Sequence, residues 1–132
     1  MIQQVAGDGV TFIGEAVQVL GNNGASDFHN VVAPSLYRQS SGEYTLFFSS
    51  GIYTDDTYTV SYATAPAATG PYTRATKPLL ANGDAGLYAP GGADIDPDGT
   101  HMVFHANELS AYNGTRLMWT AEVSTSGSTV SI

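Results

Sequence analysis

The chain has 132 residues, 12% of them charged, and its 12 acidic and 4 basic side chains leave a net charge of −8. This length predicts one domain, and the acidic balance argues against nucleic acid or an anionic membrane as partner, because both would be repelled. With no cysteine, the chain cannot form disulfides, thiolate zinc sites or thiol nucleophiles. We expect a soluble chain, because neither a secretion signal nor a membrane-spanning run is present.

Short segments of alternating apolar and polar residues, rich in aromatic and β-branched side chains, predict an all-β fold. Gly, Pro, Asn and Asp separate these segments and supply turn chemistry, and no amphipathic helix competes with them. The expected strands are Ile2–Ala6, Val10–Ile13, Val17–Leu20, Val31–Arg38, Tyr44–Ser49, Tyr58–Thr64, Tyr72–Arg74, Ala93–Asp96, His101–Ala106, Arg116–Val123 and Thr129–Ile132.

An internal repeat organises these strands. Residues of the first copy recur 56 or 57 positions later: Ala33-Pro34, Gly42, Leu46-Phe47 and Tyr62 match Ala89-Pro90, Gly99, Val103-Phe104 and Trp119. A weaker match at an offset of about 60 pairs Ile2–Gln4 with Tyr62–Thr64 and Val19-Leu20 with Leu79-Leu80. Four-stranded units at this spacing are typical of β-propeller blades, although a β-sandwich also gives short strands and turns. We therefore predict about two and a half blades: a half-blade at 1–20 and blades at 29–75 and 89–132.

The residues of the repeat also resemble a known family. The motifs Val31–Arg38, Gly42–Gly51, Tyr58–Thr64, Thr69–Thr73, Pro90–Asp94, Asp98–Ala106 and Arg116–Met118 are similar to the late blades of glycoside hydrolase family 43, so the resemblance concerns the C-terminal half only. It implies a five-bladed propeller that cleaves α-L-arabinofuranosides or β-D-xylosides from plant hemicellulose with inversion. The family context also implies secretion.

Two departures bear on that activity. Inverting hydrolysis needs one carboxyl group as acid and another as base. The family places its acid directly before the Ala-Pro pair, where this chain has Val32, and it places its base on earlier blades. No catalytic residue is therefore predicted. We expect a non-catalytic carbohydrate-binding or hemicellulase accessory protein; the alternative is a weakly active arabinofuranosidase or xylosidase whose site is rebuilt at a dimer interface from carboxylates such as Asp94 or Asp27.

Five residues are the candidates for contact with a plant cell-wall oligosaccharide or polysaccharide. Tyr53 and Tyr88 lie in expected loops where a ring can stack on a sugar, and Asp94 begins an inner strand after two glycines. Arg116 matches an arginine that the family places near substrate, although pairing with a carboxylate would explain it equally well. His29 lies in the polar approach to an inner strand.

Other patterns are weaker. Asp94, Asp96 and Asp98 imitate the start of a calcium loop, but His105 stands where a bidentate Glu is needed, so an Asp-Pro-Asp-Gly hairpin turn is the favoured interpretation and no metal or cofactor is expected. Asn113-Gly114-Thr115 fits an N-glycosylation acceptor. Because two and a half blades leave open sheet faces and edges, we expect a homodimer that completes five blades; the alternative is a fragment or split gene product whose natural partner supplies the first blades. As an accessory protein the chain would also act beside a complete hemicellulase.

Overall fold

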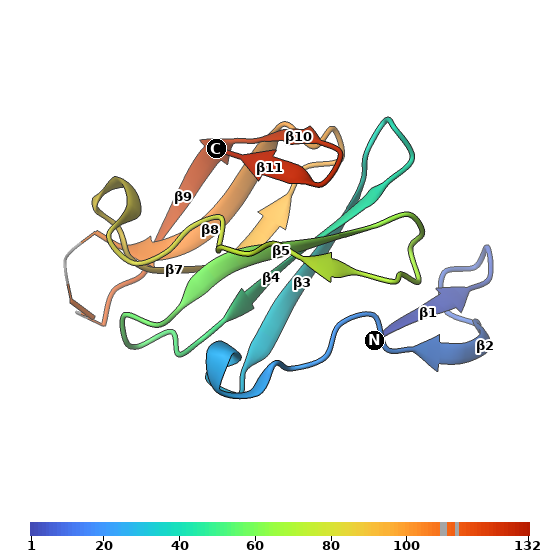
Figure 1. The fold of residues 1–132 in the computed structure, drawn as a ribbon, viewed down its shortest axis with the longest axis horizontal. Helices are drawn as coiled ribbons and strands as arrows, with labels where there is room; N and C mark the ends of the chain where they lie inside the picture. Colours follow the sequence, from blue (N-terminus) through green and yellow to red (C-terminus); the bar gives the residue numbers. More distant parts are fainter. Residues whose placement is uncertain (109–110, 113) are drawn as a thin grey trace.

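The structure, a computed structural model, describes residues 1–108, 111–112 and 114–132, and their regular structure is almost entirely β (Figure 1). The strands are β1 (Ile2–Val5), β2 (Phe12–Val17), β3 (Val31–Arg38), β4 (Tyr44–Ser50), β5 (Thr59–Ala65), β6 (Thr73–Arg74), β7 (Tyr88–Ile95), β8 (His101–Asn107), β9 (Leu117–Glu122), β10 (Ser124–Ser126) and β11 (Thr129–Ser131). Two short 3-10 helices lie in the segments that connect the sheets along the chain: η1 (Gly24–Asp27) between β2 and β3, and η2 (Asp84–Gly86) between β6 and β7. Among the described residues no helix is long and apolar enough to cross a membrane.

The strands form four antiparallel sheets. β3-β4-β5-β6 is a four-stranded sheet, which we call the first blade, and β7-β8-β9 is a three-stranded sheet, the second blade. β1 pairs only with β2, and β10 pairs only with β11. Two expected strands are therefore wrong: Val17–Leu20 is not a separate strand, because Val17 ends β2, and β7 begins at Tyr88, five residues before the expected start at Ala93. β11, at the expected Thr129–Ile132, pairs with β10.

The core lies between the two blades. Phe47 and Val60 of the first blade are fully buried, and they belong to one cluster with Ala93, Met102 and Phe104 of the second. Alternating side chains of a strand point to opposite faces, so Phe47 on one sheet and Phe104 on the other both face the space between them.

The structure corrects the register of the repeat. Residues at equivalent positions of successive blades point the same way around a propeller, so Phe47 and Phe104, which share one core, are not equivalent. The β7–β8 turn explains why the sequence match is one residue out of register with the structural match. The backbone N–H of Gln39 bonds to the carbonyl of Glu43, four residues on, whereas that of Asp96 bonds to His101, five residues on.

Because the β7–β8 turn is one residue longer than the β3–β4 turn, residues of β4 correspond to residues of β8 that lie one position later than the sequence match suggests. Tyr44 opposite Arg38 then corresponds to Met102 opposite Ile95, and Leu46 corresponds to Phe104. By the same register Trp119, opposite Phe104, corresponds to Ala63, opposite Leu46, and not to Tyr62. The Ala-Pro match holds.

The two Ala-Pro pairs have the same unusual backbone. Ala33 and Ala89 both adopt a φ of 52°, a left-handed conformation that residues with a β-carbon rarely adopt. Each lies beside a shift in the register of the innermost strand, between Val32 and Ser35 in β3 and between Tyr88 and Gly91 in β7. The repeat is thus a repeat of local geometry as well as of sequence.

Candidate functional site

The innermost strands of the two blades, β3 and β7, are joined by a small hydrogen-bond network. The Ser35 hydroxyl donates to Asp94 Oδ1 at 2.6 Å and accepts from the backbone N–H of Ile95 at 3.2 Å. The backbone N–H of Gly92 donates to the Ser49 hydroxyl at 2.8 Å. The Asp94 residue itself is exposed, so one face of its carboxylate remains open to solvent.

Two glycines allow this close approach. A β-carbon on Gly91 would lie 1.9 Å from the ring of Tyr58, and one on Gly92 would lie 2.8 Å from the ring of His105. Because Gly91 and Gly92 have no side chains, the rings of Tyr58 and His105 have room to pack against the start of β7. The same lack of side chains lets Asp94 approach Ser35.

Arg116 forms the polar centre of a second cluster. Its Nη1 donates to the carbonyl of Tyr53, and its Nη2 donates to the carbonyls of Ala89 and His105. The guanidinium lies 5.6 Å from the centre of the Tyr58 ring, so the cation also faces an aromatic surface. Burial lowers the pKa of Arg116, although nearby tyrosines oppose the shift.

These contacts bear on one of the two sequence interpretations of Arg116, the pairing with a carboxylate, while its nearness to a substrate stays a prediction. Within the described part of the chain, Arg116 makes no ion pair with a carboxylate. It instead fixes three backbone carbonyls from different segments, and through Tyr53 it positions the loop between β4 and β5.

The loop tyrosine fixed in this way is paired with another. Tyr53 and Tyr112 have ring centroids 6.3 Å apart and planes at 90°, and the two residues are 54% and 40% exposed. Tyr112 was not among the sequence candidates, although its position four residues before Arg116 is a local signal that could have identified it. Tyr88, the other predicted stacking residue, starts β7 opposite Asn107 and is partly buried.

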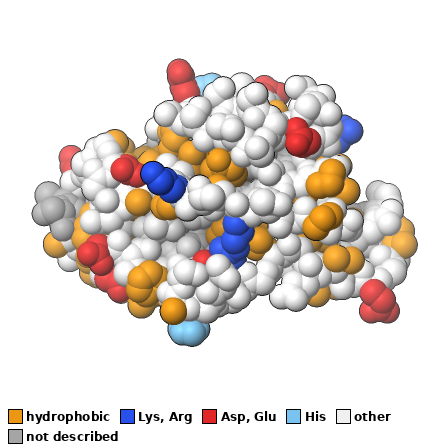
Figure 2. All heavy atoms as spheres, viewed as in Figure 1, with side chains coloured by type: hydrophobic (Ala, Val, Ile, Leu, Met, Phe, Trp, Pro, Cys, Tyr) orange, Lys and Arg blue, Asp and Glu red, His pale blue; other side chains and the backbone are white. Residues whose placement is uncertain are grey.

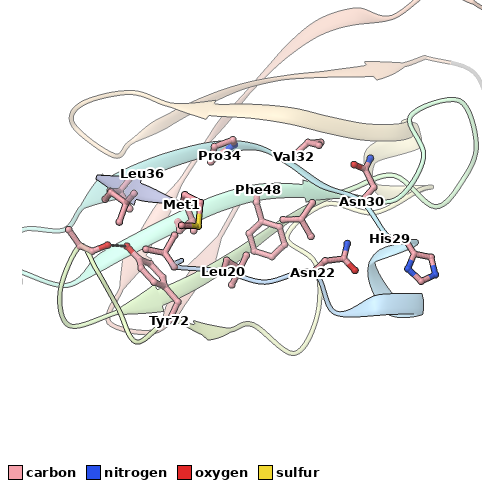
Figure 3. A pocket seen from close by; sticks show the side chains of 15 residues that line it. Met1, Leu20, Asn22, His29, Asn30, Val32, Pro34, Leu36, Phe48 and Tyr72 are labelled. Carbon is pink, nitrogen blue, oxygen red and sulfur yellow. Dashed lines mark hydrogen bonds between the residues drawn. The ribbon is translucent and has the colours of Figure 1, made fainter. Parts of the chain in front are cut away.

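His29 lies elsewhere. It is exposed, has a φ of 59°, and lines a groove of about 570 Å³ together with Val32 (Figure 3). The rest of the lining is mainly apolar, with Leu36, Phe48 and Tyr72 among its residues, and it also includes Asn22 and Asn30. The structure thus brings Arg116 and Tyr53 together, whereas no hydrogen bond or ion pair that we find in the described residues joins Asp94 or His29 to them.

Asp27, a candidate carboxylate for a rebuilt catalytic site, is already engaged in an ion pair. It is 3% exposed, and both its carboxylate oxygens accept hydrogen bonds from Arg74, at 3.0 and 2.9 Å. The backbone N–H of Asn23 donates to the same carboxylate at 2.6 Å. This buried ion pair holds the segment before β3 against β6, a long-range contact that no sequence pattern indicated.

The three aspartates of the calcium-like motif do not converge. The Asp96 carboxylate accepts hydrogen bonds from Thr100 and from the backbone of His101, and the Gly99 φ of 71° completes a hairpin turn, as the favoured interpretation predicted. Desolvation acts to raise the pKa of Asp96, but these hydrogen bonds outweigh it and hold the pKa below its ordinary value. No group of three or more His, Asp or Glu side chains in the described ranges is arranged to hold a metal ion. The glycosylation motif begins at Asn113, outside the described residues.

Comparison with known proteins concerns the fold. No protein-family model matches the sequence, and no curated protein matches it. A thermostable family-43 glycoside hydrolase superposes with a TM-score of 0.81 at 20% identity, over 98% of this chain and 45% of that structure. An endo-1,4-β-xylanase from Bacteroides thetaiotaomicron gives 0.64 at 28% identity, over 77% and 37%. An arabinanase from Bacillus subtilis gives 0.73 at 20% identity, over 92% and 44%.

These comparisons confirm the β-propeller fold and the structural resemblance to family 43. The chain spans less than half the length of each of these structures. Its assignment to their C-terminal half stays a prediction, as do the boundaries of its blades.

Proposed function

We propose that the chain is a non-catalytic carbohydrate-binding module of hemicellulose context, which binds an oligosaccharide of the arabinan, arabinoxylan or xylan type through Tyr53 and Tyr112, with Arg116 positioning Tyr53. The observation that carries this proposal is the half-exposed tyrosine pair, in which the backbone carbonyl of Tyr53 accepts a hydrogen bond from Arg116. Partly exposed aromatic rings are suited to stacking on the apolar face of a sugar, because a tyrosine ring is large, apolar and has few rotatable bonds.

The family resemblance supports this substrate class but not hydrolysis. Val32 has no acidic group that could transfer a proton, and both carboxylate oxygens of Asp27 accept hydrogen bonds from Arg74. Asp94 is the one candidate carboxylate with a solvent-exposed face, and a single carboxylate cannot serve as both acid and base in an inverting reaction. A site rebuilt at a dimer interface would need a second free carboxylate from another copy.

The test is calorimetric titration of the full chain with arabino- and xylo-oligosaccharides. We expect saturable binding that Tyr53→Ala and Tyr112→Ala each weaken by at least about tenfold, because each removes stacking area. Tyr44→Ala is the matched control, since Tyr44 also faces an arginine, Arg38, at 6.0 Å but lies at the opposite end of β4. Unchanged affinity in both tyrosine variants would contradict the proposed site.

Hydrolysis assays separate the two functions. The proposal predicts no turnover of arabinan, arabinoxylan or aryl glycosides by the chain alone, and increased release of sugar when the chain is added to a complete hemicellulase. Turnover by the chain alone that Asp94→Asn abolishes would instead establish the weakly active alternative.

A further inference from the structure

A second groove, of about 400 Å³, lies between the first blade and the segment that precedes β3, and we call it the polar groove. Three stretches of chain line it: residues 23–28 around η1, the end of β4 with the start of β5, and residues 74–78 at and after the end of β6. It is distinct from the groove of Figure 3, although Phe48 lines both. Hydroxyl groups and cations make up much of its lining, so a polar ligand suits it.

Three hydroxyl groups form a row along the polar groove. Ser50 pairs with Thr59 across β4 and β5, and their hydroxyl oxygens are 3.2 Å apart. The hydroxyl oxygens of Thr59 and Ser61, which lie on the same face of β5, are 3.4 Å apart. A hydroxyl group can donate one hydrogen bond and accept two, so this row keeps free capacity for the hydroxyl groups of a ligand.

An exposed aromatic residue also lines the polar groove. Phe28 directly follows η1 and is 48% exposed, and its φ of 50° is a left-handed conformation that residues with a β-carbon rarely adopt. Backbone hydrogen bonds hold this turn, because the N–H of Phe28 donates to the carbonyl of Ala25 and the N–H of Asn30 donates to that of Asp27. Residues in such conformations cluster at ligand sites, and an exposed ring beside hydroxyl groups is suited to stacking on a sugar.

The polar groove has the opposite charge to the chain as a whole. Arg74 and Lys77, two of the chain's four basic residues, line it, and Asp27 is the only acidic residue among its described lining. Figure 2 shows basic side chains near the middle of the face on which β5 and β6 lie. Both oxygens of the Asp27 carboxylate accept hydrogen bonds from Arg74, so these two charges cancel. Lys77 is exposed and makes no ion pair with any residue that the structure describes, so one positive charge is left uncompensated.

This charge distribution favours a carboxylate over a phosphate group as the anion. The guanidinium of Arg74 already donates to both oxygens of Asp27 and to the carbonyl of Gly21, at 2.7 Å, so its planar fork is not free to hold a phosphate. Lys77 is a point charge that one carboxylate matches, whereas a phosphomonoester carries about −1.5 to −2 charges at pH 7. The ligand that fits the lining therefore has one carboxylate, several hydroxyl groups and an apolar ring face.

We propose that the polar groove binds a uronic acid, a sugar whose ring carries a single carboxylate. The sugar ring stacks on Phe28, its hydroxyl groups bond to the row formed by Ser50, Thr59 and Ser61, and its carboxylate faces Lys77. A groove of about 400 Å³ is large enough for one such ring. This proposal does not depend on the binding of neutral oligosaccharides by the tyrosine pair, which lies on other loops.

The test is an NMR titration of the isotope-labelled full chain with glucuronate, and with glucose and acetate as matched ligands. Glucose has the ring without the carboxylate, and acetate has the carboxylate without the ring. We expect glucuronate to cause saturable shifts of the backbone amides at residues 23–28, 59–61 and 75–77, and to bind at least about threefold more tightly than either matched ligand. Shifts confined to Tyr53 and Tyr112 would overturn the site, and tighter binding of glucose phosphate than of glucuronate would overturn the choice of a carboxylate.

Two substitutions separate the contacts, with circular dichroism as the check that each variant is folded. Lys77→Gln should weaken glucuronate binding by about threefold and leave glucose binding unchanged, whereas Lys77→Arg keeps the charge and should keep the affinity. Phe28→Asn removes the ring but tolerates a positive φ, and it should weaken the binding of both sugars. Arg38→Gln is the matched control, because it removes one positive charge from the end of β3, outside the lining of the polar groove. Equal losses in Lys77→Gln and Arg38→Gln, or an unchanged affinity in Phe28→Asn, would overturn the proposal.

Discussion

Replacing Arg74 with methionine is expected to destabilise the chain by about 3 kcal/mol, because Asp27 would remain buried without a cation. Breaking a buried pair costs about 3–5 kcal/mol, whereas an exposed pair contributes about 0–1 kcal/mol. The side chains of Asp27 and Arg74 are 5% and 25% exposed, which places this pair at the lower end of the buried range. Loss of the guanidinium over the Phe48 ring, 4.8 Å from its centre, adds to the cost.

The measurement is urea unfolding of the full chain, with the free energy of unfolding taken from the midpoint and slope. Arg38→Met is the control, since Arg38 is exposed and faces Tyr44 at 6.0 Å without a carboxylate partner in the described residues. Adding Asp27→Asn to Arg74→Met should recover part of the loss, because the neutral amide no longer needs a cation. A cost for Arg74→Met no larger than that of Arg38→Met would refute the reasoning.

Two further predictions concern the turns and the close packing. Gly91→Ala should cost about 1–3 kcal/mol, because its β-carbon meets the Tyr58 ring at 1.9 Å, whereas Gly7→Ala meets nothing within 4 Å and should be neutral. Equal melting temperatures for these two variants would contradict the close packing of the Tyr58 ring on Gly91. Hydrogen bonds from the side chain and backbone of Thr11 lower the pKa of Asp8 from 3.8 to about 2, so the stability that they contribute is complete above pH 3.8 and is lost as the pH falls through about 2. An NMR titration should show that midpoint, and Thr11→Val should raise it; a midpoint at the ordinary value in both proteins would be inconsistent with these contacts.

Three of the central strands could be predicted closely because their signals are local. β3 spans Val31–Arg38, the range expected from sequence, and β4 and β8 each extend one residue beyond their predicted ends. The register of the repeat could not be predicted as well. Because the β7–β8 turn has one extra residue, Phe104 corresponds to Leu46 and not to Phe47. A shift of one residue along a strand turns each side chain to the opposite face of the sheet.

The candidate site was predicted in part. Tyr53 was chosen as a loop aromatic residue and Arg116 from the family resemblance, and the two lie together, but their neighbour Tyr112 was overlooked. Asp94 and His29 are on other elements, and the role of Arg116 as a clamp on backbone carbonyls depends on three segments that meet only in the folded chain.

Sequence alone determined the all-β class, the repeated unit and the family resemblance, because alternation, turn residues and recurring motifs are properties of short segments. Tertiary structure decided which face each strand presents and which charged groups pair. The Asp27–Arg74 ion pair joins residues 47 positions apart, and the groove beside Leu36 is lined by residues of the N-terminal segment, β3 and β4. Such contacts depend on how sheets stack, and stacking is set by packing between elements that are distant in sequence.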